Sequence, residues 1–178
     1  KKLNMKTPYI IAEIGSNFDQ SLTKAKKMIT VAKQCGVDAV KFQLFNPKKL
    51  YPSKKDIKLR KIFNNIKLNK KFVPHLIKFS KKTRINIFFS VFDEANLNFL
   101  KNYNLDTYKI ASSEITNLNL IKSIINTKKT IIISTGMSDV KDIKNAMNLF
   151  NHKKNKKILM QCTSLYPTKI SQVNLNVF

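Results

Sequence analysis

The residues Tyr108-Lys-Ile-Ala-Ser-Ser-Glu-Ile-Thr-Asn117 combine a short apolar strand with an abrupt polar end. Lys109 lies inside the predicted strand, Ser112 and Ser113 end it, and Glu114 follows. A charged side chain in the middle of a buried strand is strongly unfavourable unless it is paired. Lys109 therefore needs either an oppositely charged partner or a ligand to bind.

Other stretches of the chain repeat this pattern of an apolar run followed by polar residues. The predicted strands cover residues 9–15, 39–45, 85–92, 106–111, 130–134 and 157–162. Apolar residues at helical spacing predict helices over 22–35, 57–65, 69–82, 94–102, 118–126 and 139–150. Ser21, Asn69 and Asp139 are the expected N-caps, and Pro74 can kink the helix that contains it. Strands that alternate with helices predict an α/β fold with a parallel sheet and right-handed crossovers.

Two parallel-sheet architectures compete for this pattern. A doubly wound sheet usually carries a glycine-rich phosphate loop after its first strand, and Gly15-Ser-Asn-Phe-Asp19 lacks that motif. A TIM (β/α)8-type barrel has eight units over about 250 residues, and this 178-residue chain fits the first six. We therefore predict one barrel domain over residues 1–178, truncated after about six βα units, with two unpaired sheet edges. Residues 173–178 stop where another helix would start.

Alternation along the strands predicts which side chains face the barrel interior. Apolar residues on both sides of Lys41 and Lys109 would pack on the helices, so these lysines, together with Gln43 and Glu13, point inward. Active sites of such barrels lie at the carboxyl ends of the strands. Further hydroxyls follow the strands at this end, namely Ser90, Ser112, Ser134, Thr163, Ser164 and Tyr166.

This set of side chains suits an anionic substrate. Two inward lysines with one or two carboxylates leave surplus positive charge, and lysines with hydroxyl donors suit a phosphate or carboxylate. Glu13 and Glu114 are the available acid–base groups. The alternative is that Lys41 and Lys109 only form structural ion pairs with these two glutamates.

The formal net charge of +24 would ordinarily suggest nucleic acid as the partner. Arginine, which nucleic-acid readers favour, occurs only at positions 60 and 84, and the lysines are dispersed along the chain. We therefore consider nucleic acid an unlikely ligand and attribute the charge partly to an A/T-rich genome that favours Lys, Asn and Ile codons.

The remaining residues of chemical interest are isolated. Cys35 and Cys162 have no metal-ligand spacing and are expected to be packed, reduced cysteines, and His75 and His152 fall on or near helices. This segment therefore supplies no metal cluster. No apolar run approaches the length of a membrane span, so we expect a soluble, cytoplasmic protein.

Six motifs resemble those of the sialic acid (N-acetylneuraminate) synthase family, which includes the pseudaminic and legionaminic acid synthases. They occur in the family's order and extend over nearly the whole chain: Ile10-Ile-Ala-Glu-Ile-Gly-Ser-Asn17, Asp38-Ala-Val-Lys-Phe-Gln43, Ser90-Val-Phe-Asp93, the 108–117 stretch, Ile133-Ser-Thr-Gly-Met137 and Gln161-Cys-Thr-Ser-Leu-Tyr-Pro167. The resemblance implies condensation of phosphoenolpyruvate with an N-acetylated hexosamine such as N-acetylmannosamine, with release of phosphate. It also implies a divalent metal, Mn²⁺ or Mg²⁺, and a homodimer for the complete enzyme.

The resemblance further implies roles for individual residues. Lys41 and Lys109 would bind phosphoenolpyruvate, with hydrogen bonds from Ser90, Ser112, Ser134 and Ser164. Glu13 and Glu114 would act around the aldehyde and the attacking water, and Gln43 and Tyr166 would line the sugar pocket.

This chain also departs from the family pattern. Asn17-Phe-Asp-Gln20 replaces the usual Asn-His-Asn-Gly, which indicates a variant sugar substrate, and Ser90-Val91 replaces Thr-Pro. The family's two metal-binding histidines lie on strands seven and eight, which this segment lacks together with the C-terminal antifreeze-like domain. An inactive or regulatory barrel fragment, a related 3-deoxy sugar acid synthase and a basic nucleic-acid-binding protein are the alternative functions.

Overall fold

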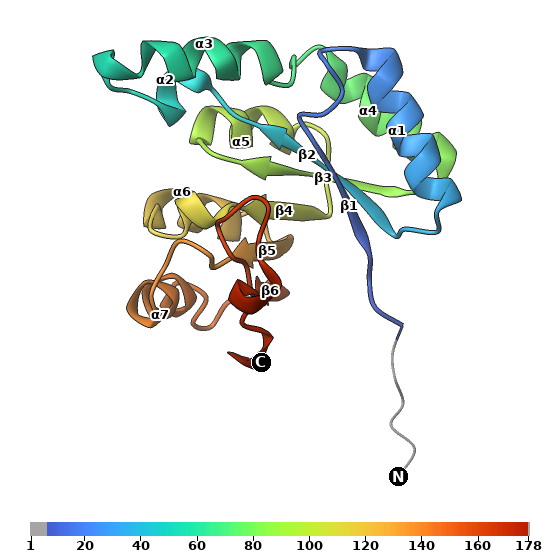
Figure 1. The fold of residues 1–178 in the computed structure, drawn as a ribbon. Helices are drawn as coiled ribbons and strands as arrows, with labels where there is room; N and C mark the ends of the chain where they lie inside the picture. Colours follow the sequence, from blue (N-terminus) through green and yellow to red (C-terminus); the bar gives the residue numbers. More distant parts are fainter. Residues whose placement is uncertain (1–6, 178) are drawn as a thin grey trace.

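A computed structural model of the chain describes residues 7–177 as one curved parallel sheet covered by helices (Figure 1). The six strands are hydrogen-bonded in chain order, from β1 to β6. Their bounds are β1 Ile11–Gly15, β2 Ala39–Leu44, β3 Asn86–Val91, β4 Thr107–Ile110, β5 Thr130–Ser134 and β6 Lys157–Met160. All neighbouring pairs are parallel, which confirms the predicted α/β class.

Helices follow the strands and cover the outer face of the sheet. They are α1 Leu22–Gln34, α2 Pro47–Leu50, α3 Ile57–Ile66, α4 Phe72–Thr83, α5 Glu94–Lys101, α6 Leu118–Ile125 and α7 Val140–Asn148. Short 3-10 turns occupy η1 Lys54–Asp56, η2 Ser112–Glu114, η3 Ile170–Gln172 and η4 Leu175–Val177. Helices α1 and α4 lie side by side (Figure 1). None of the helices in the described part of the chain is both long and apolar enough to cross a membrane.

Two of the three predicted N-caps are confirmed and one is wrong. Ser21 accepts from the backbone N–H of Lys24 at the start of α1, and Asp139 begins α7 with a reciprocal capping box. Helix α4 instead begins after Lys71, and Asn69 accepts from the N–H of Lys71 in the preceding turn. Pro74 lies within the first turn of α4, where its missing N–H has no helical partner to lose, so α4 continues to Thr83.

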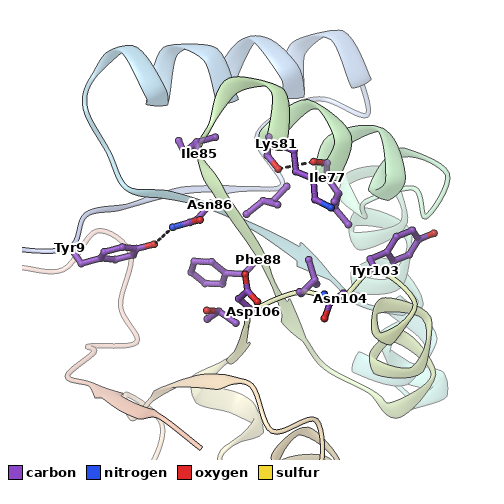
Figure 2. Close-up of a pocket in the computed structure, with 13 residues that line it drawn as sticks. Tyr9, Ile77, Lys81, Ile85, Asn86, Phe88, Tyr103, Asn104 and Asp106 are labelled. Atoms are coloured by element: carbon purple, nitrogen blue, oxygen red, sulfur yellow. Dashed lines mark hydrogen bonds between the residues drawn. The ribbon is translucent and has the colours of Figure 1, made fainter.

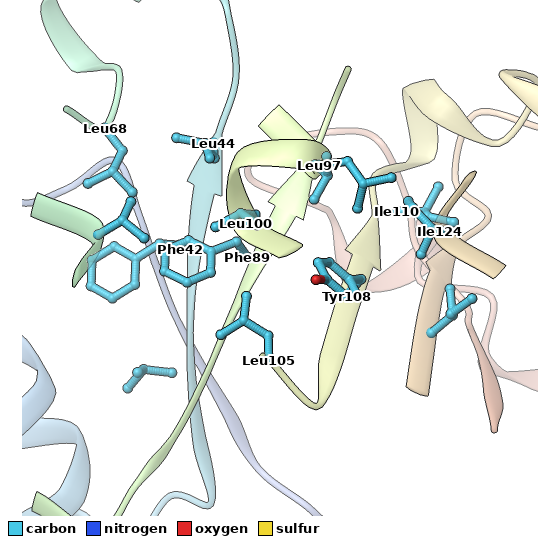
Figure 3. Close-up of a cluster of buried hydrophobic side chains, with 14 of the residues drawn as sticks. Phe42, Leu44, Leu68, Phe89, Leu97, Leu100, Leu105, Tyr108, Ile110 and Ile124 are labelled. Atoms are coloured by element: carbon cyan, nitrogen blue, oxygen red, sulfur yellow. The ribbon is translucent and has the colours of Figure 1, made fainter. Parts of the chain in front are cut away.

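The main core lies between the outer face of the sheet and the helices (Figure 3). Phe42, Phe89 and Tyr108 extend from adjacent strands into this layer, where Leu97 and Leu100 of α5 meet them. These strand residues alternate with the lysines predicted to face inward. The same packing therefore fixes the opposite orientation of Lys41 and Lys109.

The inner face of the sheet is built in two levels. Ile11, Ala39, Phe88 and Ile132 form a small apolar cluster near the amino ends of the strands. The next inward positions toward the carboxyl ends are polar. They lie beside one another in the sheet, since the register pairs Glu13 with Lys41, Gln43 with Ser90, and Ser90 with Lys109. Ser134, two residues beyond Ile132, continues this polar level on β5.

Strands β1 and β6 are the two edges of the sheet within residues 7–177. Every residue of β6 is exposed, unlike the residues of the neighbouring β5, which are mostly buried. The sheet is therefore an open part of a TIM-type barrel, as predicted. β6 ends two residues earlier than predicted, at Met160.

Candidate active site

Lys41 and Glu13 meet on the inner face of the sheet as an ion pair between adjacent strands. Lys41 Nζ also donates to Ser90 Oγ on β3 at 3.0 Å. The Lys41 side chain is 12% exposed, whereas that of Glu13 is 47% exposed. The Lys41 side chain is thus mostly buried against the inner face of the sheet, and the Glu13 carboxylate reaches solvent.

Gly15 makes room for the Glu13 carboxylate. The register between β1 and β2 shifts between Glu13 and Gly15, and Gly15 has a φ of 56°, in the left-handed region. A Cβ at Gly15 would lie 2.9 Å from Glu13 Oε1. Gln43 Nε2 donates to the same oxygen at 3.4 Å, so Gln43 and Glu13 face one another across β1 and β2.

Lys109 is the most buried charged group of the site, at 5% exposure. Its ammonium donates to Ser134 Oγ on β5 and, at 2.7 Å, to the carbonyl oxygen of Ile110. Within residues 7–177 no carboxylate lies within salt-bridge distance of Lys109. Lys41 therefore forms the ion pair with Glu13 that the structural alternative expects, whereas Lys109 forms no such pair with Glu114.

The surroundings of Lys109 make its positive charge unfavourable. Burial, and then the neighbouring positive charge of Lys41, lower the pKa of Lys109 from its ordinary 10.5 to about 8, although Cys162 and Glu13 act in the opposite direction. At neutral pH Lys109 is still mostly protonated. An anion that binds beside it would compensate the charge that the protein leaves unpaired.

The loops after β4, β5 and β6 bring further donors together. The N–H of Gly136, after β5, donates to Ser112 Oγ, after β4, at 3.1 Å. A Cβ at Gly136 would lie only 2.8 Å from Ser164 Oγ, after β6. Three consecutive loops therefore place Ser112, Gly136 and Ser164 at one point of the carboxyl rim, beyond Ser134.

Two other predicted residues are on the same rim without joining this cluster. The Glu114 carboxylate accepts from Ser113 Oγ at 3.3 Å and from Asn117 Nδ2 at 3.0 Å. Asn117 is also the N-cap of α6, which holds Glu114 near the start of that helix. Tyr166 follows β6 and is 93% exposed.

Cys162 is a member of the site that the sequence interpretation treated only as a packed cysteine. Its thiol donates to Ser134 Oγ at 3.2 Å, so it extends the contact chain from Lys109 through Ser134. The signal was its place two residues after β6, where the other strands are also followed by polar residues. Cys35 is exposed, which contradicts the expectation that it is packed.

Phe18 does not face the site. It is fully buried in the main core, with its ring edge against Phe42 at a centroid distance of 5.8 Å. Since Phe42 points away from the inner face, the Phe18 position lies behind the sheet. The side chain at the position of the family's histidine therefore faces the core, and the variant sugar substrate remains a prediction.

A separate pocket of about 230 Å³ lies at the opposite end of the sheet (Figure 2). It is lined by residues at the amino ends of β3 and β4, and Asn86 Nδ2 donates to the Tyr9 hydroxyl there at 2.9 Å. This end of a TIM-type barrel generally serves stability. The lysine and serine cluster is therefore the candidate active site.

The described residues do not form a metal site. No group of three or more His, Cys, Asp or Glu side chains in residues 7–177 is arranged to hold a metal ion. Glu13 has Lys41 and Gln43 as its polar neighbours, which suits an anion more than a cation. The donors gathered here are ammonium, hydroxyl and backbone N–H groups, which bind oxyanions.

The sequence is similar to a known protein family and to several of its members. The sequence model of the NeuB family matches residues 28–178. The chain is 36% identical to an N,N'-diacetyllegionaminic acid synthase of Campylobacter jejuni, over 96% of this chain and 56% of that protein. It is 32% identical to a Campylobacter jejuni pseudaminic acid synthase, over 96% of this chain and 53% of that protein.

A solved structure is similar as well. The N-acetylneuraminic acid synthetase of Leptospira borgpetersenii, crystallised in complex with citrate, superposes with a TM-score of 0.90 and 32% identity. The match covers 95% of this chain and 59% of that one. The chain thus spans about half the length of the curated relatives that it matches.

Proposed function

This chain belongs to the NeuB family, and we propose that it carries the phosphoenolpyruvate-binding part of a nonulosonic acid synthase. The observation that carries the proposal is the buried Lys109, which has hydroxyl and carbonyl partners but no carboxylate within salt-bridge distance in the described residues. A second lysine, Lys41, lies on the same face of the sheet. Phosphoenolpyruvate has two anionic groups, a phosphate and a carboxylate, and so matches a site with two lysines.

The proposed reaction joins phosphoenolpyruvate to an N-acetylated amino sugar in its open-chain aldehyde form. C3 of phosphoenolpyruvate forms a bond to the aldehyde carbon, water adds at C2, and the C–O bond to phosphate breaks. The products are a nonulosonic acid and inorganic phosphate. N-acetylmannosamine and the related dideoxy sugars are the acceptor candidates, because the relatives are named as synthases of N-acetylneuraminic, legionaminic and pseudaminic acids.

The lysines and hydroxyls would hold the anion. Lys41 and Lys109 would bind phosphoenolpyruvate and neutralise the charge that leaves with phosphate. Ser90 and Ser134 accept from these lysines, so their own protons are available to the substrate. Ser112 and Ser164 on the neighbouring loops would complete the set of donors.

The carboxylates would act on the other side of the substrate. Glu13 is half-exposed and held by Lys41 and Gln43, so it can accept a proton from the attacking water. Glu114, held by Asn117, would act around the sugar aldehyde. Gln43 and Tyr166 would line the sugar pocket.

The resemblance also implies a divalent metal that would polarise the aldehyde. Residues 7–177 contain no cluster that would hold it, so the roles proposed for the lysines and serines do not depend on it. A homodimer is proposed for the protein at the length of its relatives.

Two measurements test the proposed function. Phosphoenolpyruvate should bind the 178-residue chain, and Lys109→Met should abolish that binding. A protein that carries this chain at the length of its relatives should release phosphate from phosphoenolpyruvate only when an N-acetylated amino sugar and Mn²⁺ are present. Binding without phosphate release from any such sugar would contradict the synthase and support the alternative, an inactive or regulatory barrel.

A further inference from the structure

We infer that Gly136 is a positioning residue that sets the Ser112 hydroxyl for the phosphate of the substrate. The inference rests on the proposed function, since it concerns the same anion site. Gly136 lies between the loops of both serines, because its N–H donates to Ser112 Oγ at 3.1 Å and a Cβ built on it would lie 2.8 Å from Ser164 Oγ. It therefore connects the loops after β4 and β6 through the loop after β5.

The hydrogen bond from the Gly136 N–H leaves the Ser112 hydroxyl to act as a hydrogen-bond donor toward a ligand. A hydroxyl has one proton to donate and two lone pairs to accept with. Since Ser112 Oγ accepts the Gly136 N–H, its own proton is left for a ligand. An oxyanion needs donors of this kind.

The same arrangement recurs at the two lysines. Ser90 Oγ accepts from Lys41, and Ser134 Oγ accepts from Lys109 and from the Cys162 thiol. Three serines of the site therefore each accept from a fixed donor. Gly136 donates to Ser112 as the two lysines donate to Ser90 and Ser134. Its role in the anion site is therefore to orient the Ser112 hydroxyl.

The loop after β6 lies so close to Gly136 that it leaves no space for a side chain at this position. A Cβ would lie 2.7 Å from the carbonyl oxygen of Cys162 and 2.8 Å from Ser164 Oγ, distances at which one side must move. The Cys162 contact is with backbone, which cannot rotate away as a side chain can. The φ of Gly136 lies outside the left-handed region, so alanine would be unfavourable here because of space and not because of backbone strain.

The test is a double-variant cycle read by calorimetric titration with phosphoenolpyruvate. Gly136→Ala and Ser112→Ala should each weaken binding about tenfold, the effect of one charge-assisted hydrogen bond. Because both act through the same hydroxyl, the double variant should bind within about threefold of the weaker single variant. Ser138→Ala is the matched control, since Ser138 lies in the same loop and donates only to the Thr135 carbonyl. It should bind as the unsubstituted chain does.

Three results would overturn the inference. Unchanged affinity in Gly136→Ala, with binding intact in the unsubstituted chain, would refute the role of Gly136 and leave the proposed function standing. Additive losses of about a hundredfold in the double variant would refute the route through Ser112. Absence of phosphoenolpyruvate binding in the unsubstituted chain would refute the proposed function, and this inference with it.

A further measurement does not depend on the folding of Gly136→Ala. In Ser112→Ala the Gly136 amide loses its acceptor, so its hydrogen exchange should accelerate while the β5 amides keep their protection. Unchanged exchange at Gly136 would show that the hydrogen bond to Ser112 is not formed, and the inference would fail.

Discussion

Replacing Lys109 by methionine should make the protein more stable at neutral pH while removing its affinity for phosphoenolpyruvate. Methionine has similar length and no charge, so it fills the same space without a buried ammonium. Lys109 is 5% exposed and has no carboxylate within salt-bridge distance in residues 7–177. A buried group that is unfavourable for folding and required for binding is typical of a functional site.

The magnitude follows from the pKa of Lys109, which falls from 10.5 to about 8. Since each pKa unit corresponds to about 1.4 kcal/mol, the charged lysine costs the folded state about 3 kcal/mol. Ser134 and Ile110 lose a donor in the variant, at about 1 kcal/mol or less for each. The net gain should be about 1–2 kcal/mol, or about 3–6 °C in Tm for a chain of this size.

The pH dependence gives the sign of the effect. Below about pH 8 Lys109 is protonated in both the folded and the unfolded protein, so the variant keeps its full advantage. Between pH 8 and 10.5 the unfolded protein holds more protons, so the unsubstituted chain gains stability as the pH rises. The two stability curves should therefore cross, with the methionine variant less stable near pH 10.5.

Urea denaturation from pH 6 to 10.5, followed by circular dichroism, measures this difference directly. Lys144→Met on the exposed side of α7 is the control for loss of a lysine charge, and it should change stability little at any pH. If Lys109→Met is less stable than the unsubstituted chain at pH 7, or if the difference does not depend on pH, the account of Lys109 is wrong.

Three further substitutions test the site and its support. Glu13→Gln should change the free energy of unfolding by less than about 1 kcal/mol, because the ion pair with Lys41 is half-exposed, and it should strengthen phosphate binding in a titration; weaker binding would contradict the surplus-charge argument. Phe18→His should lower stability to urea by about 2–4 kcal/mol, because an imidazole would replace a buried ring. In a protein that carries this chain at the length of its relatives, the same substitution should leave the sugar preference of the proposed synthase unchanged; a changed preference would place position 18 in the proposed sugar pocket. Asp139→Ala should lower Tm by about 2–4 °C through loss of the α7 capping box, whereas Asp139→Asn should not, and equal losses in both would exclude the cap as the cause.

The alternation of strand residues was sufficient to predict the orientation of the central site residues. Lys41 and Lys109 each lie between apolar neighbours that pack on helices, and a strand allows only one face for the residue between them. The ion pair of Lys41 with Glu13 was among the expected alternatives, but the hydroxyl partners of the two lysines could not be predicted. The hydroxyls that accept from them, Ser90 and Ser134, depend on the registers between β2 and β3 and between β4 and β5.

Contacts between loops were beyond the reach of sequence patterns. The hydrogen bond from Gly136 to Ser112 and the bulge at Gly15 depend on loop conformation, which no periodicity encodes. The capping role of Asn69 was misplaced because Asn and Asp also form hydrogen-bonded turns just outside a helix. The motif showed that Phe18 occupies the position of the family's histidine. It could not show that the side chain is buried in the core behind β1 and β2.

The central claim is that Lys109, a buried lysine with a lowered pKa, binds an oxyanion at the carboxyl ends of these strands. Calorimetric titration with phosphoenolpyruvate at pH 8, repeated in two buffers of different ionisation enthalpy, tests it most directly. At a pH close to the pKa of Lys109, about half of these groups are unprotonated, so binding should take up nearly half a proton per site. Binding without proton uptake, or uptake that persists in Lys109→Met, would contradict the claim.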